Sequence, residues 1–254
     1  MTASISVYET LARMVREGRP VCLATLISAT ARPDNPGAGL PDIGAKLLIP
    51  TDGSAALGSI HPEIDRAIAS DATRLLAEER SQALTYEVAG GTLEVFVECF
   101  PPPPHLVIVG AVHIAITLCK LAKLLGYRVT IIDPREAFAT QARFPEADRI
   151  MVEWPEEAMQ AIDLNMSTYV VVLTHDPKLD LPALMAALSS PVRYVGAIGS
   201  RKTSAERRAS LAAMGATDEQ IARLHSPVGL AIGARSPAEI AVSIMAEIIA
   251  VRRL

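Results

Sequence analysis

Residues 105–113 read HLVIVGAVH, and their pattern indicates the fold class of the C-terminal half of the chain. Residues 105–109 form a continuous apolar run, which is typical of a strand buried on both faces of a sheet. A glycine turn follows at Gly110, and residues 115–125 then have the pattern of a helix that Gly126 is placed to end. Strand, glycine turn and helix in this order predict the first βα unit of an α/β domain.

The same alternation continues towards the end of the chain. Further apolar strands are expected at residues 128–132, 169–173 and 193–198, and further helices at residues 179–188, 205–214 and 236–252. Because apolar strands alternate with helices, we predict an α/β fold, a Rossmann-like doubly wound parallel sheet with helices on both faces. Ligands of such sheets bind at the carboxyl ends of the strands, where this sequence places its glycines and polar residues.

Four consecutive prolines at residues 101–104 divide the chain, because they cannot donate backbone hydrogen bonds and favour a stiff, extended spacer. We predict an N-terminal α+β domain over residues 1–100, a linker over 101–104 and the Rossmann-like domain over 105–254. The expected N-terminal elements are a helix at 7–17, a strand at 21–27, hairpin turns at 51–54 and 90–91, and a helix with Pro62 at its first position.

The composition excludes several classes of protein. The net charge of −4 and an aromatic content of 4% argue against a nucleic-acid-binding protein. The N-terminal residues carry no apolar run with a cleavage site, and no segment has the length of a membrane helix.

Cys22, Cys99 and Cys119 lie in apolar runs and read as reduced, buried thiols, so we expect a cytoplasmic protein without a disulfide framework. No CxxC or HExxH motif is present, so we expect no metal site.

The turn after the first strand of the C-terminal half stands where a dinucleotide fingerprint would lie. Asp133 follows Gly110 by 23 residues, close to the ~20 expected for a ribose-binding acid. Gly110, His113 and Asp133 are therefore candidate cofactor-binding residues. Val112, however, replaces the second glycine of the fingerprint, and its branched side chain obstructs a pyrophosphate, which argues against NAD(P). Local pairing or capping is the alternative role for Asp133.

A second candidate site follows the strand at residues 193–198. Gly199, Ser200, Arg201 and Lys202 combine a flexible turn with two cations, and Thr203 with Glu206 fits a capping box. We therefore expect a helix to start near Thr203, with Arg201 and Lys202 just before it. Helix N–H groups and adjacent cations make an anion site. A solvated basic turn is the alternative.

A third candidate site is formed by His175 and Asp176, at the end of the strand at residues 169–173. A histidine and an aspartate at a strand end can orient each other and titrate near neutral pH. The alternative is that Asp176 or Asp180 caps the following helix, and this capping role is the one we expect for Asp180.

A fourth candidate is the loop over residues 226–236, which contains Gly229 and Gly233. Ser236, Pro237 and Glu239 predict a strong helix start immediately after it. The loop could close over a ligand, and a plain structural turn is the alternative. No complete catalytic set accompanies these four segments, so we expect a binding protein in preference to a free-standing enzyme.

Together the four segments resemble the xanthine dehydrogenase accessory protein family, XdhC/CoxI. The resemblance is carried by residues 107–145, 171–184 (VVLTHDPKLDLPAL), 194–215 (YVGAIGSRKTSAERRASLAAMG) and 226–248 (SPVGLAIGARSPAEIAVSIMAEI). It implies a Rossmann-like domain that binds a molybdopterin-type cofactor, and a protein that supports cofactor maturation and its insertion into a molybdenum hydroxylase apoenzyme. A sulfur-donating desulfurase is a further implied partner.

At two positions this chain departs from the family pattern, and both bear on the functions that the resemblance implies. Family members commonly have GAGH where this chain has GAVH at residues 110–113. They also commonly have Gly-Gly-Cys-x-Glu where residues 58–63 here read GSIHPE, without a cysteine. The missing cysteine leaves a role in sulfuration open, and it is consistent with a divergent role such as maturation of carbon monoxide dehydrogenase.

Two other functions stay open on the sequence. Gly110, Asp133 and His175 would suit an NAD(P)-dependent oxidoreductase, and the N-terminal domain would suit a scaffold that contacts a partner enzyme without holding a ligand. A homodimer through the last helix is also open, although core packing explains its apolar residues equally well. These residues are Ile240, Ile244, Ile248 and Ile249.

Overall fold

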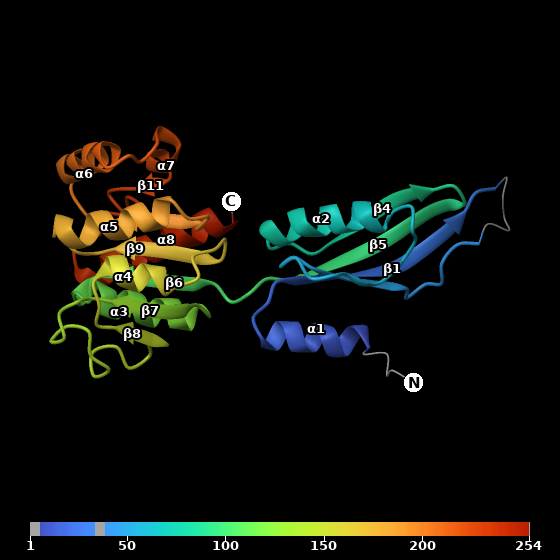
Figure 1. Ribbon diagram of the computed structural model, residues 1–254, viewed down its shortest axis with the longest axis horizontal. Helices are drawn as coiled ribbons and strands as arrows, with labels where there is room; N and C mark the ends of the chain where they lie inside the picture. Colours follow the sequence, from blue (N-terminus) through green and yellow to red (C-terminus); the bar gives the residue numbers. More distant parts are fainter. Residues whose placement is uncertain (1–5, 34–38, 254) are drawn as a thin grey trace. The chain divides into compact units, whose positions relative to one another are not determined.

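The computed structural model describes residues 6–33 and 39–253. The first five residues of the N-terminal stretch in which we expect no secretory signal lie outside that range. The chain divides into two compact units, Met1–Pro102 and Pro103–Leu254 (Figure 1). Among the described residues, no helix is both long and apolar enough to span a membrane.

The N-terminal unit contains an antiparallel five-stranded sheet in the order β3-β2-β1-β5-β4. Helix α2 packs on one face of this sheet through Ile68 and Leu75, and helix α1 contributes Met14 to a smaller cluster with Leu23 and Leu48. The elements are α1 (Val7–Arg16), β1 (Val21–Ala31), β2 (Lys46–Pro50), β3 (Leu57–Gly58), α2 (Asp65–Ala77), β4 (Gln82–Val88) and β5 (Gly91–Phe100).

The second helix begins later than the sequence indicated. Pro62 was expected at its first position, but α2 starts at Asp65. The Asp65 carboxylate accepts hydrogen bonds from the N–H groups of Ile60 at 2.9 Å and His61 at 3.0 Å and from the Ser59 hydroxyl at 2.6 Å. These bonds hold residues 59–61 against the start of α2, and residues 62–64 form a turn that precedes the helix.

The C-terminal unit contains a parallel six-stranded sheet in the order β11-β10-β9-β6-β7-β8. Numbered within the domain, this order is 3-2-1-4-5-6, which is that of a doubly wound Rossmann sheet, so the predicted fold class is confirmed. The strands are β6 (His105–Val109), β7 (Arg128–Ile132), β8 (Arg149–Met151), β9 (Thr168–Val172), β10 (Tyr194–Ala197) and β11 (Leu224–His225).

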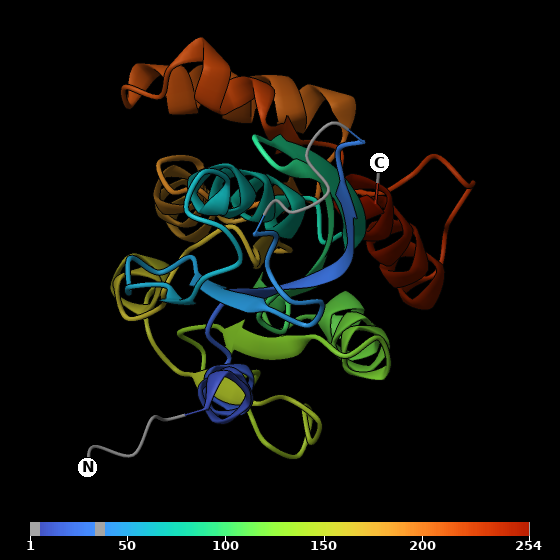
Figure 2. The same cartoon turned by 90° about the vertical axis from the view of Figure 1, so that its right-hand side faces the viewer.

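Helices cover both faces of the parallel sheet because alternate side chains of each buried strand point to opposite faces. Leu106 and Ile108 of β6 pack with α3 and α8, whereas Val107 and Val109 pack against the helices of the other face. Figure 2 shows α3 (green) and α8 (red) on one side, and α4 and α5 on the other. The helices are α3 (His113–Leu124), α4 (Pro155–Gln160), α5 (Pro177–Leu188), α6 (Arg201–Ala213), α7 (Asp218–Ala222) and α8 (Pro237–Arg253).

The starts of two C-terminal helices bear on the capping predictions. Ser236 and Glu239 exchange hydrogen bonds across the first turn of α8, so the predicted start is confirmed. The predicted start of α6 near Thr203 is wrong, because Ser200 is the N-cap and its hydroxyl accepts the Thr203 N–H at 3.1 Å. In α8, Ile244 and Ile248 are fully buried in the core of the unit.

Candidate functional site

The site begins where β6 and β9 end side by side. The chain after β6 continues into α3 on one face of the sheet, and the chain after β9 continues into α5 on the other face. This is the topological switch point of the sheet, at which doubly wound folds open a crevice. Gly110 and Thr174 follow the two strands, and a Cβ atom on Gly110 would lie 2.5 Å from Cγ2 of Thr174. Gly110 also has φ of 105°, so a residue without a side chain is required here.

A pocket of about 490 Å³ opens at this switch point. Its apolar surface comes from residues at the starts of α3 and α5 and at the end of β9, and its polar surface from one cation, one imidazole and one carboxylate. The lining residues are Val112, Arg135, Leu173, Thr174, His175, Asp176, Pro177 and Leu179. Two of the predicted site residues, His175 and Asp176, therefore line the same pocket.

Asp133 lies buried behind the pocket, and its carboxylate is fully engaged. One oxygen accepts the Arg135 N–H at 3.0 Å and Nε at 2.8 Å, and the other accepts the Ala111 N–H at 2.8 Å and Arg135 Nη2 at 2.7 Å. Burial raises the pKa of Asp133, but the hydrogen bonds from Arg135 and Ala111 outweigh burial and hold it below its ordinary value. Because a carboxylate has about four lone-pair sites, Asp133 has no acceptor left for a ribose hydroxyl.

Arg135 is the cation of the pocket, although the sequence did not single it out as a ligand-binding residue. Its side chain is 45% exposed, although it pairs with the fully buried carboxylate of Asp133. The guanidinium also lies over the ring of Phe138, 4.3 Å from its centroid. Asp133 and Phe138 together fix the orientation of a guanidinium that still faces the pocket. The signal available in the sequence was an arginine two residues after a strand-end aspartate.

Helix α3 starts at the pocket without a side-chain cap. Its N-cap residue is Val112, whose side chain makes no capping hydrogen bond and instead lines the pocket. Backbone N–H groups at an uncapped helix start attract anions. His113, the first residue of α3, is exposed and does not belong to the lining residues.

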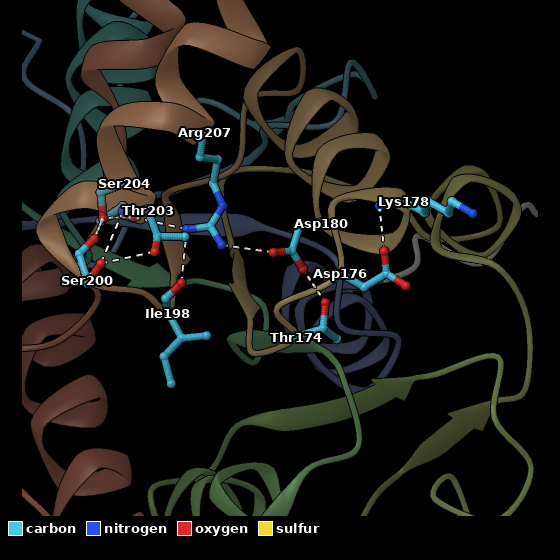
Figure 3. Close-up of polar contacts among 10 residues, drawn as sticks. Thr174, Asp176, Lys178, Asp180, Ile198, Ser200, Thr203, Ser204 and Arg207 are labelled. Atoms are coloured by element: carbon cyan, nitrogen blue, oxygen red, sulfur yellow. Dashed lines mark hydrogen bonds and ion pairs between the residues drawn. The ribbon is translucent and has the colours of Figure 1, made fainter.

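Asp176 caps helix α5 and also lines the pocket. One of its oxygens, Oδ1, accepts the Lys178 N–H at 3.0 Å, and Figure 3 shows the other oxygen turned away from the residues drawn. The neighbouring His175 is exposed. A capping role and a lining role are therefore compatible for Asp176.

Asp180 does not cap a helix, so the role expected for it is wrong. Its carboxylate is 4% exposed and accepts hydrogen bonds from the Thr174 hydroxyl and, at 2.8 Å, from Nη2 of Arg207, which is also 4% exposed. Burial raises the pKa of Asp180 in spite of these two bonds. The Asp176 side chain, four residues earlier, already caps α5, which leaves Asp180 on the inner face of the helix.

Arg207 ties several strand ends together. Its Nη1 donates to the Ile198 carbonyl at 2.9 Å and to the Ser226 hydroxyl at 3.3 Å, and Figure 3 shows its side chain reaching from α6 towards Asp180. This residue was not among those predicted from the sequence. The spacing of Ser204, Arg207 and Leu211 along one face of α6 was the signal, because these three are the buried residues of the helix.

The second predicted site lies on the first turn of α6. Arg201 and Lys202 are the first two residues of the helix, not the residues before it, because Ser200 is the N-cap. Both side chains are exposed, and Lys202 lies 3.9 Å from Glu206. None of Gly199, Ser200, Arg201 and Lys202 is among the residues that line the switch-point pocket.

The loop with Gly229 and Gly233 is attached to helix α8 at one end. The Gly229 N–H donates to Glu247 at 2.9 Å, and a Cβ on Gly229 would collide with Ser243. Glu247 also accepts a 2.5 Å hydrogen bond from the Tyr194 hydroxyl and lies 3.4 Å from His225. By contrast, Gly233 is exposed, with no atom within 4 Å of the position of a Cβ.

The described residues also bear on metals and thiols. Within residues 6–33 and 39–253, no group of three or more His, Cys, Asp and Glu side chains is placed to hold a metal ion. The three cysteines are free thiols. Cys119 is buried alone in the C-terminal core, whereas Cys22 and Cys99 lie next to each other in the N-terminal sheet.

A parallel sheet in this strand order, with a pocket at its switch point, defines a Rossmann-type domain. Residues 106–248 match the XdhC Rossmann domain, which is more than half of the chain. The chain therefore belongs to the XdhC family.

Individual relatives agree with this assignment. The chain is 33% identical over 162 residues to a Bacillus subtilis protein named as a probable component of xanthine dehydrogenase, and 31% identical over 163 residues to the molybdenum cofactor insertion chaperone PaoD of Escherichia coli. Each alignment covers 64% of this chain, and 47% and 45% of the two relatives. An uncharacterized protein of Escherichia coli, YqeB, is 27% identical over 98% of this chain and 46% of its own length. The chain thus spans less than half the length of these curated relatives.

A solved structure shares the fold. The crystal structure of a xanthine dehydrogenase from Bacillus halodurans superposes with a TM-score of 0.54 and 20% sequence identity, covering 96% of this chain and 95% of that one. At this identity the likeness concerns the fold alone.

Proposed function

We propose that this protein binds a molybdopterin-type cofactor in the switch-point pocket and delivers it to a molybdenum hydroxylase apoenzyme. The observation that carries the proposal is the pocket of about 490 Å³ between the ends of β6 and β9, with Arg135 facing it from a fixed position. A pocket of this size lies within the range of ordinary small-molecule sites, which is about 300–1,000 Å³.

The lining residues suit the two chemical ends of a phosphorylated pterin. Arg135 and the uncapped start of α3 offer donors to a phosphate, because the hydrogen bonds of Arg135 to Asp133 use Nε and Nη2 and leave Nη1. The free oxygen of Asp176 offers an acceptor to the amino group and ring N–H of the pterin. Val112 and Leu179 provide apolar surface for the ring system.

The same geometry disfavours the oxidoreductase alternative. A dinucleotide fold of this kind uses the strand-end acid to bind the ribose, but the Asp133 carboxylate already accepts four hydrogen bonds from Ala111 and Arg135. Val112 adds a branched side chain to the pocket where a glycine would admit a pyrophosphate.

The delivery step is supported by family membership and by a relative named as a molybdenum cofactor insertion chaperone. We further propose that the stretch 101–104 links an N-terminal domain that contacts the apoenzyme to the domain that holds the cofactor. The remaining predicted residues are not among those that line the pocket, and we propose that they lie around it or contact the partner apoenzyme. They are Gly110, His113, Gly199, Ser200, Arg201, Lys202, Gly229 and Gly233.

The proposal is tested by titrating the purified chain with molybdopterin and following the quenching of its single tryptophan, Trp154, or the heat released. We expect saturable binding that Arg135→Gln weakens at least tenfold. Arg149→Gln is the matched control, because Arg149 is an exposed arginine at the start of β8 and does not line the pocket.

Two outcomes would contradict the proposal. Binding weaker than about 1 mM corresponds to only ~4 kcal/mol and would exclude a carrier role. Equal affinity of wild type and Arg135→Gln would show that the ligand does not bind in the pocket. The double variant Arg201→Ala/Lys202→Ala would then show whether the ligand binds at the start of α6.

A further inference from the structure

Two of the three cysteines face each other across neighbouring strands of the N-terminal sheet. Cys22 of β1 and Cys99 of β5 are direct partners in the antiparallel register, and their Sγ atoms lie 3.2 Å apart. They are 77 positions apart in the sequence, so nothing in the local pattern places them together.

The backbone geometry of the pair suits a covalent bond between the two sulfurs. The Cys99 N–H donates to the Ser81 hydroxyl at 3.0 Å, on the β4 side of the sheet, so it points away from β1. Cys22 and Cys99 are therefore a non-hydrogen-bonded pair, whose Cα atoms are typically about 4.5 Å apart. Disulfides form over Cα separations of about 4.4–6.8 Å, so the strands need no rearrangement.

The two thiols differ in exposure and in acidity. Cys22 is fully buried against the Ala72 carbonyl of α2, whereas Cys99 is half-buried and lies one residue before the end of β5. The hydrogen bond from Cys22 lowers the pKa of the Cys99 thiol, and the same bond together with burial raises the pKa of Cys22. Cys99 is thus the accessible nucleophile, and Cys22 is placed to react with it next.

We propose that Cys22 and Cys99 form a redox-active dithiol that is oxidised reversibly by low-molecular-weight disulfides such as oxidised glutathione. The Cys99 thiolate attacks one sulfur of oxidised glutathione, which gives a mixed disulfide and releases one glutathione thiolate. Cys22 then loses its proton and attacks Cys99 Sγ, which forms the Cys22–Cys99 disulfide and releases the second glutathione. The protein loses two electrons and two protons, and oxidised glutathione becomes two reduced glutathione molecules.

This site is separate from the proposed cofactor pocket, because both cysteines belong to the N-terminal unit. The disulfide would join β1 to β5 close in sequence to the proline segment at residues 101–104. The ratio of oxidised to reduced glutathione would therefore set whether β1 and β5 are covalently linked. A disulfide that exchanges with glutathione is compatible with a reducing compartment, because it is a transient state and not a structural bond.

The test uses the full chain, reduced, desalted and incubated with oxidised glutathione before alkylation and mass spectrometry. We expect the wild type to lose two of its three thiols without keeping a glutathione adduct, to yield a Cys22–Cys99 linked peptide, and to recover both thiols with dithiothreitol. Cys119→Ser is the matched control and should behave like the wild type.

Two single variants separate the roles of the thiols. Cys22→Ser should stop at a glutathione adduct on Cys99, and Cys99→Ser should keep both remaining thiols. A wild-type protein that keeps all three thiols, or that keeps glutathione on Cys99 without a link to Cys22, would overturn the proposal. The wild-type peptide map decides the question even if a variant fails to fold.

Discussion

The Arg207 guanidinium donates from Nη2 to Oδ2 of Asp180 at 2.8 Å, and the two side chains are each 4% exposed. This pair connects α6 to α5 beneath the carboxyl edge of the sheet. Asp180 also accepts a hydrogen bond from the hydroxyl of Thr174, and the methyl group of Thr174 packs against Gly110. One buried ion pair therefore supports both sides of the edge at which we place the ligand.

Removing Arg207 should destabilise the C-terminal unit strongly. We expect Arg207→Met to lower the free energy of unfolding by about 3–5 kcal/mol, because it leaves the Asp180 carboxylate buried without its partner. Urea unfolding followed by the fluorescence of Trp154 measures this unit, since Trp154 is the only tryptophan of the chain.

An exposed pair on the same helix provides the comparison. Lys202 and Glu206 lie 3.9 Å apart with side chains 87% and 65% exposed, so Lys202→Gln should cost less than about 0.5 kcal/mol. Similar losses in the two variants would show that the Arg207 pair has no special structural role.

Adding a methyl group at Gly110 should damage the switch point. Gly110→Ala forces a side chain onto φ of 105° and into contact with Cγ2 of Thr174, so we expect a loss of at least about 1–3 kcal/mol in the free energy of unfolding. The double variant with Thr174→Ser removes that methyl and keeps the hydroxyl for Asp180, so thermal denaturation should show partial recovery. No recovery would mean that backbone strain alone explains the loss.

We expect the buried His105 to make the protein less stable as the pH falls. Burial lowers its pKa from 6.5 to about 4, and its Nε2 lies 2.9 Å from the Thr130 hydroxyl. Between these two pH values, His105 therefore binds a proton in the unfolded chain but not in the folded protein. The contribution of neutral His105 is complete above pH 6.5 and is lost as the pH falls towards 4, by about 3 kcal/mol in total.

This loss is measured as the slope of unfolding free energy against pH. His105→Gln should flatten the slope in this window, and His113→Gln, at an exposed histidine, should leave it unchanged. A His105 resonance that titrates near 6.5 in proton NMR would contradict the prediction.

Asp176 predicts a change in affinity without a change in fold. Asparagine also caps helices, so Asp176→Asn should keep the hydrogen bond to the Lys178 N–H and alter stability by less than about 0.5 kcal/mol. It removes the charge offered to the pterin, and a hydrogen bond to a charged group contributes about 1.5–3 kcal/mol. Titration with molybdopterin should therefore show affinity roughly ten- to hundredfold weaker. Unchanged affinity would remove Asp176 from the proposed pterin contact.

The C-terminal fold could be predicted because its signals are local. Residues 105–109 are apolar throughout, and Gly110 and Gly126 mark the limits of the first helix, so strand and helix order follow from the sequence. The start of α6 was misplaced because Ser200, three residues before Thr203, caps the helix. The start of α2 was misplaced because residues 62–64 form a turn and the helix begins, without a side-chain cap, at Asp65.

The contacts that could not be predicted from the sequence depend on tertiary structure. Arg207 and Asp180 are 27 positions apart, and the pairing of Cys22 with Cys99 depends on strand register over 77 positions. His175 and Asp176 could be identified from the sequence because both closely follow a strand. Arg135 was missed although it follows Asp133 by two residues, because the orientation of its guanidinium depends on Asp133 and Phe138 together.

Reconstitution of a molybdenum hydroxylase apoenzyme measures whether this protein delivers the cofactor. Apoenzyme is mixed with molybdopterin cofactor preloaded on the wild type or on the Arg149→Gln control, and with cofactor in the presence of Arg135→Gln. We predict that hydroxylase activity returns several-fold faster with the first two than with free cofactor, and that Arg135→Gln gives only the rate of free cofactor. Equal rates with and without the wild-type chain would show that the protein does not deliver the cofactor.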